Sequence, residues 1–179
     1  MRDYSQNLED NEINFLAIID INTFNQTIPT LEEWKKTVIE IVASEDFKNT
    51  DAVEIWNEPN GSAYIQPENH SEMLKTAYAI IKNYRAIPIV LAGVSPNCGG
   101  WQSYLNTVFA NDDIENYLDY MGIHFYDDMQ TNLNTLEFVK GLTTKPIWLT
   151  ETGKPSATED NTEAIQAQYV NSIYSTFEP

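Results

Sequence analysis

The chain has 179 residues, of which 42% are hydrophobic and 21% charged, so it is long enough for one domain with a substantial core. Its 27 acidic and 10 basic side chains give a net charge of −17, which repels nucleic acid and anionic membrane surfaces and excludes both as expected partners. The single cysteine, Cys98, excludes an intrachain disulfide and a cysteine-based zinc site. We find no signal-peptide pattern and no apolar stretch of membrane-spanning length, and we therefore expect a soluble chain.

Segments with the periodicity of strands alternate with segments of helical periodicity along the chain. The expected strands are residues 13–20, 52–56, 87–92, 118–124 and 146–150. The expected helices are residues 30–42, 71–84, 101–109, 133–141 and 162–177. Thr30 followed by Glu33 is typical of a capping box at the start of the first helix, and Ser71 is the expected cap of the second. No linker interrupts the pattern, which predicts a single domain spanning 1–179.

Repeated strand–helix units predict an α/β protein with parallel strands and right-handed crossovers. Two architectures fit this pattern, an open doubly wound sheet and a (β/α) barrel, and both place ligands at the carboxyl ends of the strands. The first and fifth strands start 133 residues apart, or about 33 residues per unit. Eight such units need about 265 residues, close to the ~250 of a typical barrel. In a barrel, this chain would supply about five of the eight units.

Polar residues follow three of the expected strands. The second strand ends in EIWNEPN, which contains Asn57 and Glu58, and the fifth ends in IWLTETG, which contains Glu151. The fourth ends in GIHFYDD, where a period of two turns His124 and Tyr126 to the same side. Two carboxyl groups from different strands that face one pocket are what glycoside hydrolysis requires.

The runs EIWNEPN, HFY and WLTETG resemble clan A of the glycoside hydrolases, whose members are retaining (β/α)8-barrel enzymes. EIWNEPN is most similar to family thirty-nine, and the His-x-Tyr pattern is also similar to family five. The resemblance implies that the five strands correspond to barrel strands three to seven. It therefore implies a partial or truncated TIM barrel that lacks strands one, two and eight.

The resemblance also implies roles for four residues: Glu58 is the acid/base, Glu151 the nucleophile, Asn57 the partner of a sugar 2-hydroxyl, and Tyr126 a hydrogen-bond partner of Glu151. An acid/base must hold its proton until it donates it, so we expect an apolar setting and the nearby Glu151 charge to raise the pKa of Glu58. A phenol that donates to Glu151 would keep that nucleophile ionised.

Three further residues have a structural and a functional interpretation. His124 either contacts the sugar or anchors the core, and Trp101 is the best candidate for a platform on which a sugar stacks. Trp148 is out of phase with Glu151 in a strand of period two, which predicts that it packs beneath the helices. We expect no metal, because His70 is the only other histidine, and no cofactor.

The open ends of a five-strand sheet would expose unpaired backbone groups and apolar surface. A second copy of this chain, a missing segment of a longer protein, or a rearranged open sheet would have to cover them.

The first functional hypothesis is a retaining glycoside hydrolase that cleaves β-linked oligo- or polysaccharide with Glu58 and Glu151. The alternative is a non-catalytic carbohydrate-binding or structural remnant of such a barrel. A third hypothesis, a doubly wound protein of another function, lacks a phosphate-binding glycine loop and a GxSxG nucleophile elbow.

Overall fold

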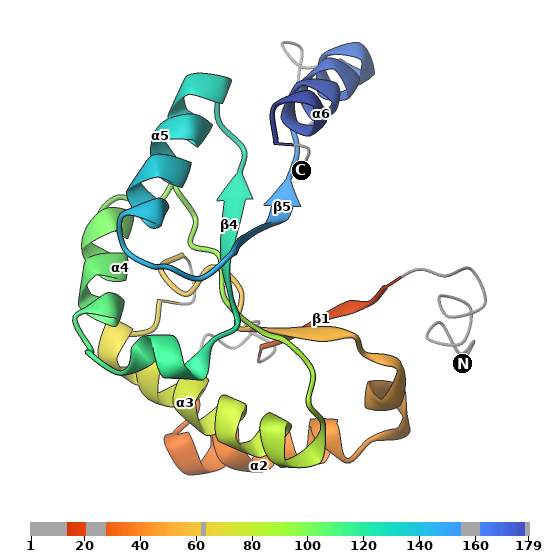
Figure 1. Cartoon of the computed structure of the whole chain (residues 1–179), viewed down its shortest axis with the longest axis vertical. Coiled ribbons are helices and arrows are strands. Elements are labelled where there is room, and N and C mark those ends of the chain that lie inside the picture. Colours follow the sequence, from red (N-terminus) through yellow and green to blue (C-terminus); the bar gives the residue numbers. More distant parts are fainter. Residues whose placement is uncertain (1–13, 21–27, 62–63, 155–161, 178–179) are drawn as a thin grey trace.

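The computed structural model describes residues 14–20, 28–61, 64–154 and 162–177. One curved sheet of five parallel strands follows the order of the sequence, which confirms an α/β fold like part of a TIM barrel (Figure 1). The strands are β1 (Leu16–Ile19), β2 (Ala52–Ile55), β3 (Ile89–Leu91), β4 (Tyr120–Phe125) and β5 (Ile147–Thr152). The helices are α2 (Leu31–Val42), α3 (Pro67–Tyr84), α4 (Trp101–Phe109), α5 (Met129–Lys140) and α6 (Glu163–Phe177), with 3-10 helices at Glu45–Asn49 and Ile114–Tyr117.

The ends of the helices follow from local hydrogen bonding. The predicted capping box of α2 is present, because Thr30 accepts from the Glu33 backbone N–H and Glu33 accepts from the Thr30 backbone N–H. The prediction for α3 was wrong: this helix begins at Pro67, and Ser71 lies inside it, donating to the Pro67 carbonyl. Proline suits the first helical position because its missing N–H has no helical partner there. Helix α5 also begins earlier than predicted, at Met129.

The core lies between the sheet and helices α2 to α5, which line its outer side (Figure 1). Trp34 of α2 is fully buried there, and its indole N–H donates to the Met73 carbonyl of α3 at 2.9 Å. Its ring packs against Trp56, which directly follows β2, with 5.6 Å between ring centroids. This packing fixes the two helices against the end of the strand from which the candidate site starts.

The prediction for Trp148 was also wrong. The pairing of β4 with β5 is irregular between Ile123 and His124, so that Gly122 pairs with Trp148 while His124 pairs with Glu151. The irregularity shifts the strand period, and Trp148 therefore lies on the same inner face as Glu151. There it stacks on Tyr120, with ring centroids 4.1 Å apart.

The strands differ in how well they are covered. All four residues of β2 are buried, whereas all six residues of β5 are only half-buried. On β1, at the other end of the sheet, Ile18 is 44% exposed. Within the described ranges, none of the helices combines the length and hydropathy that crossing a bilayer would require.

Candidate active site

The loop after β2 has a strained backbone. Trp56 and Glu58 have φ angles of 75° and 41°, in the left-handed region that non-glycine residues rarely adopt. The Trp56 backbone N–H donates to the Ile19 carbonyl of β1 at 2.8 Å, and the Gly61 N–H donates to the Glu58 carbonyl at 2.8 Å. Such strain persists where surrounding contacts over-determine the conformation, and it occurs preferentially at functional sites.

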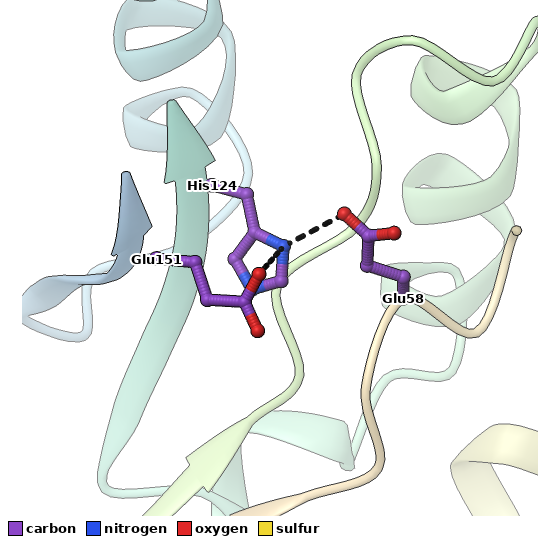
Figure 2. A group of neighbouring side chains, drawn as sticks. All are labelled: Glu58, His124 and Glu151. Carbon is purple, nitrogen blue, oxygen red and sulfur yellow. Dashed lines mark hydrogen bonds and ion pairs between the residues drawn. The ribbon is translucent and has the colours of Figure 1, made fainter. Parts of the chain in front are cut away.

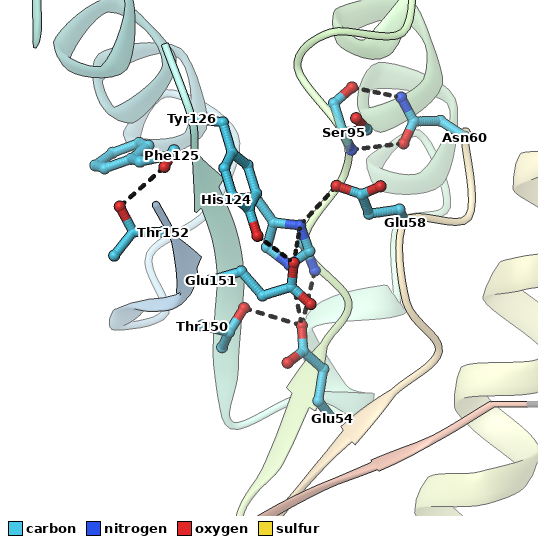
Figure 3. Close-up of polar contacts among 11 residues, drawn as sticks. Glu54, Glu58, Asn60, Ser95, His124, Phe125, Tyr126, Thr150, Glu151 and Thr152 are labelled. Carbon is cyan, nitrogen blue, oxygen red and sulfur yellow. Dashed lines mark hydrogen bonds and ion pairs between the residues drawn. The ribbon is translucent and has the colours of Figure 1, made fainter. Parts of the chain in front are cut away.

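Asn60 links this loop to the loop that follows β3. Its side-chain amide donates to the Ser95 carbonyl at 2.9 Å and accepts from the Ser95 N–H at 2.8 Å (Figure 3). Asn60 is buried, so this pair of bonds is shielded from water. Sequence reasoning did not assign a role to Asn60, because its partner lies 35 residues away.

The two candidate catalytic glutamates meet at one histidine. His124 of β4 is buried, and its Nδ1 lies 3.0 Å from Glu58 Oε1 and 3.5 Å from Glu151 Oε2 (Figure 2). One carboxylate oxygen of Glu58 and one of Glu151 lie within 4.8 Å of each other. The carboxyl ends of β2, β4 and β5 thus bring together three residues that the sequence placed at strand ends.

Tyr126 lies beside Glu151, as the resemblance implied. Its hydroxyl donates to Glu151 Oε2 at 2.9 Å (Figure 3). Burial, together with this bond to the carboxylate, raises the pKa of Tyr126 to about 12. The phenol therefore stays protonated and remains a donor to Glu151 over the whole neutral pH range.

The pKa of Glu58 departs from the expectation. The hydrogen bond from His124 lowers the pKa of Glu58, and this effect outweighs partial burial, which acts in the opposite direction. The sequence pattern could not show that the imidazole would lie closer to Glu58 than to Glu151. In the sugar-free site, Glu58 is therefore held towards its ionised form.

Asn57 and Trp101 occupy different settings. The Asn57 side-chain oxygen is buried and has no hydrogen-bond partner within the described part of the chain, and its predicted contact with a sugar stays a prediction. Trp101 begins α4, and its ring packs edge-on against Phe138 of α5 with centroids 5.1 Å apart. In the described chain this contact joins α4 to α5, and the role of Trp101 as a sugar platform stays a prediction.

A further carboxyl group lies close to these residues. Glu54 of β2 is fully buried, and its Oε1 lies 4.0 Å from His124 Nε2. It accepts from the Thr150 hydroxyl, one residue before Glu151, at 3.1 Å (Figure 3). Sequence reasoning missed Glu54, although a charged residue in the apolar run AVEIW was a visible signal.

Glu58, His124 and Glu151 are also close enough together to hold a metal ion. Their facing atoms already bind one another, however, since Nδ1 of His124 bonds Glu58 and the Tyr126 hydroxyl bonds Glu151. Two carboxyl groups with a histidine and a tyrosine between them can pass a proton and offer a nucleophile without an ion.

Several solved structures share this fold. An oligosaccharide-binding protein of GH128 subgroup VII from Trichoderma gamsii matches with a TM-score of 0.64 and 16% identity, over 93% of this chain and 64% of that protein. A GH128 subgroup VI exo-β-1,3-glucanase from Aureobasidium namibiae matches with a TM-score of 0.60 and 19% identity, over 96% of this chain and 64% of that protein. A GH128 subgroup V exo-β-1,3-glucanase from Cryptococcus neoformans matches with a TM-score of 0.60 and 17% identity, over 92% of this chain and 58% of that protein.

The chain thus spans less than two thirds of each of these proteins. A search of curated protein sequences returned no match. These three neighbours belong to GH128. The specific resemblance of the sequence motifs to families thirty-nine and five therefore stays a prediction. The family model for the glycosyl hydrolase catalytic core matches residues 6–179, nearly the whole sequence. The chain therefore belongs to the glycosyl hydrolase catalytic core family.

Proposed function

We propose that this chain is a retaining glycoside hydrolase in which Glu58 is the acid/base and Glu151 the nucleophile. The observation that carries the proposal is the approach of the two carboxylates to within 4.8 Å. Retaining enzymes hold their carboxyl groups about 5 to 5.5 Å apart, whereas inverting enzymes leave about 6.5 to 9.5 Å for a water molecule.

The substrate class in this proposal is a β-linked glucan with 1,3 linkages. Two of the structural neighbours described above are exo-β-1,3-glucanases. Asn57 stands directly before Glu58, and in this proposal its side-chain oxygen, which has no partner in the described chain, would accept from a sugar hydroxyl. We therefore place β-1,3-gluco-oligosaccharides first among the sugars to be tested.

The reaction would proceed in two displacements. Glu151 attacks the anomeric carbon while Glu58 protonates the leaving oxygen, which gives a glycosyl ester on Glu151. Water then attacks the anomeric carbon with Glu58 as base, which releases the sugar and restores both carboxyl groups. The Tyr126 hydroxyl, 2.9 Å from Glu151, would hold the attacking carboxylate in place.

His124 has a defined part in this scheme. The hydrogen bond from the His124 ring lowers the pKa of Glu58. Glu58 must therefore become protonated when the sugar binds, or lose this hydrogen bond, before it can donate a proton to the leaving oxygen. Replacing His124 by Asn should raise the pKa of Glu58 and shift the alkaline limb of the kcat/KM profile to higher pH. The alkaline limb of this profile reports the pKa of the general acid in the free enzyme. An alkaline limb at the same pH in the variant and the wild type would contradict this role for His124.

The central experiment combines trapping with hydrolysis. A 2-fluoro glucosyl inhibitor should increase the intact mass of the protein by one glycosyl group, mapped to Glu151. Glu151→Gln should abolish labelling and the release of glucose from β-1,3-gluco-oligosaccharides. Glu137→Gln, at an exposed carboxyl of α5, is the matched control and should behave as the wild type. Hydrolysis that is unchanged in Glu151→Gln would disprove the assignment.

A second candidate function is oligosaccharide binding without hydrolysis. One structural neighbour is an oligosaccharide-binding protein, and the ionised Glu58 of the sugar-free site suits binding better than proton donation. Thermal stabilisation by a gluco-oligosaccharide, with no labelling and no product, would favour this candidate over the hydrolase.

A further inference from the structure

Glu54 is a carboxyl group that the proposed reaction does not use. It lies in β2, four residues before Glu58, and is fully buried. It pairs in register with Val90 of β3 on one side and Ile18 of β1 on the other. A carboxyl group in such a place costs free energy unless its oxygens are hydrogen-bonded, so its contacts call for an explanation.

The contacts of Glu54 join three strands at the level just below the candidate site. Its Oε1 accepts from the Gly93 backbone N–H beyond β3 at 3.0 Å and from the Thr150 hydroxyl of β5 at 3.1 Å. The residue after Thr150 is Glu151. Figure 3 shows Glu54 directly beneath His124 and Glu151, with its carboxyl group pointing toward both.

Two glycines leave the space for these side chains. A Cβ at Gly122 of β4 would lie 2.8 Å from Glu54 Oε1 and 2.8 Å from the Leu91 carbonyl oxygen. A Cβ at Gly93 would lie 2.3 Å from His124 Cδ2. Both distances are far below van der Waals contact, so any side chain at either glycine would displace Glu54 or His124.

The surroundings of Glu54 shift its pKa in opposing directions. Burial raises the pKa of Glu54, although the Gly93 N–H, His124 and the Thr150 hydroxyl each act to lower it, and Glu151 adds to the rise. Its Oε2 has no hydrogen-bond partner in the described chain. Both hydrogen bonds that the Glu54 carboxyl group accepts in the described chain therefore fall on Oε1.

We propose that Glu54 is a positioning residue: its carboxyl group ties Gly93 and Thr150 to β2, and the placement of Glu151 and His124 relative to Glu58 depends on that tie. The proposal deepens the proposed hydrolase function and rests on it for its kinetic test. Glu54 itself touches no substrate in this scheme. It acts through Thr150 and through the ring of His124.

Two variants separate the hydrogen bonds from the charge. Glu54→Gln keeps an oxygen that can accept from Gly93 and Thr150, whereas Glu54→Met keeps the length of the side chain and removes both bonds. Val90→Ala, at the buried register partner on β3, is the matched control for lost core packing alone. Melting temperature, kcat and KM on a β-1,3-gluco-oligosaccharide are measured for each variant well below its melting temperature.

We expect Glu54→Gln to retain kcat within about threefold and Glu54→Met to lose about tenfold or more, with KM little changed in both. Val90→Ala should lower the melting temperature and leave kcat nearly unchanged. Wild-type kcat in Glu54→Met would overturn the proposal. Equal losses in Glu54→Gln and Glu54→Met would also overturn it, because a charge rather than the hydrogen bonds would then be essential.

A readout independent of hydrolysis uses the histidines, of which the chain has only two. Side-chain ¹⁵N NMR signals, assigned with His70→Phe, report whether His124 Nδ1 still donates to Glu58. Glu54→Met should change the His124 signals, and Glu54→Gln and Val90→Ala should leave them in place; unchanged signals in Glu54→Met would overturn the proposal. This comparison holds even if the wild type does not hydrolyse glucan, an outcome that would count against the proposed function alone.

A smaller perturbation remains informative if Glu54→Met fails to fold. Thr150→Val keeps the shape of the side chain and removes one of the two bonds on Glu54 Oε1. We expect it to lower kcat by about threefold to tenfold and to shift the His124 signals in the same direction as Glu54→Met. Wild-type kcat and signals in Thr150→Val would contradict the proposal.

Discussion

Strands β2 and β5 each supply one candidate catalytic glutamate, but the protein surrounds them very differently. β2 lies between β1 and β3 with every residue buried, whereas β5 is half-buried along its whole length and, in the described chain, pairs with β4 alone. Glu58 therefore follows a buried strand inside the sheet, whereas Glu151 lies on a half-buried strand at the edge of the described sheet. The comparison teaches that the two halves of one site need not be equally well supported.

The two glutamates are also held by different means. The loop that carries Glu58 is held by backbone hydrogen bonds from Trp56 and Gly61. Two hydrogen bonds between the Asn60 side chain and the Ser95 backbone hold it as well. These contacts maintain its left-handed backbone. Glu151 depends on the β4 ladder, on the Tyr126 hydroxyl and on the neighbouring Thr150. Changes near β5 should therefore affect catalysis more than folding.

The largest expected effect compares the same substitution in the two strands. Ile55→Ala in β2 removes a fully buried side chain and should lower the free energy of unfolding by about 2 to 5 kcal/mol. Ile147→Ala in β5, where the side chain is half-buried, should cost about half as much or less. Urea denaturation measures both values. Equal losses would mean that β5 is as well packed as β2.

The second prediction concerns acid sensitivity on the β2 side. Burial lowers the pKa of His70, which packs beside Tyr104, to about 4, with the Ile55 carbonyl partly opposing the shift. Between pH 6.5 and about 4 the unfolded chain binds a proton that the folded chain does not, so stability falls as pH falls, by about 3 kcal/mol.

His70→Phe should remove this dependence. The free energy of unfolding, measured by denaturation at several pH values, should decline less steeply below pH 6.5 in the variant than in the wild type. The comparison uses the slope, because the substitution also changes packing at every pH. Parallel slopes would show that His70 titrates normally in the folded protein.

The smallest expected effect on folding is on the β5 side. Tyr126→Phe removes the donor to Glu151, and a hydrogen bond to a charged group of this kind corresponds to a loss of about tenfold to hundredfold in kcat. The free energy of unfolding should change by less than about 1 kcal/mol, because Tyr126 is only half-buried. Tyr174→Phe, at a tyrosine 64% exposed on α6, is the control. A large loss of stability with normal turnover would reverse the comparison.

Much of the fold was predictable because its signals are local. Thr30 and Glu33 are three residues apart, and the capping box they form depends on little else. The alternation of strands and helices predicted a parallel sheet, and parallel order brings strand ends to one edge. For that reason the positions of Glu58, His124 and Glu151 at strand ends sufficed to predict that they would lie close together.

Other features of the site depend on residues far apart in the sequence. A strict alternation of side chains along β5 predicted the wrong face of the sheet for Trp148. The irregular pairing that changes this alternation arises only where β5 pairs with β4. The lowered pKa of Glu58 depends on the ring of His124, 66 residues away. Glu54 was visible as a lone charge in an apolar strand, but its partners Gly93 and Thr150 were not.

The sequence by itself determined the element order, the parallel sheet and the strand ends at which the acidic residues stand, because periodicity and capping act over a few neighbouring residues. Only the tertiary structure decided which of those residues touch, which carboxyl group is buried, and in which direction the pKa of Glu54 and of Glu58 is shifted. Those properties depend on distance and on exclusion of water, and both arise when segments remote in the chain pack together.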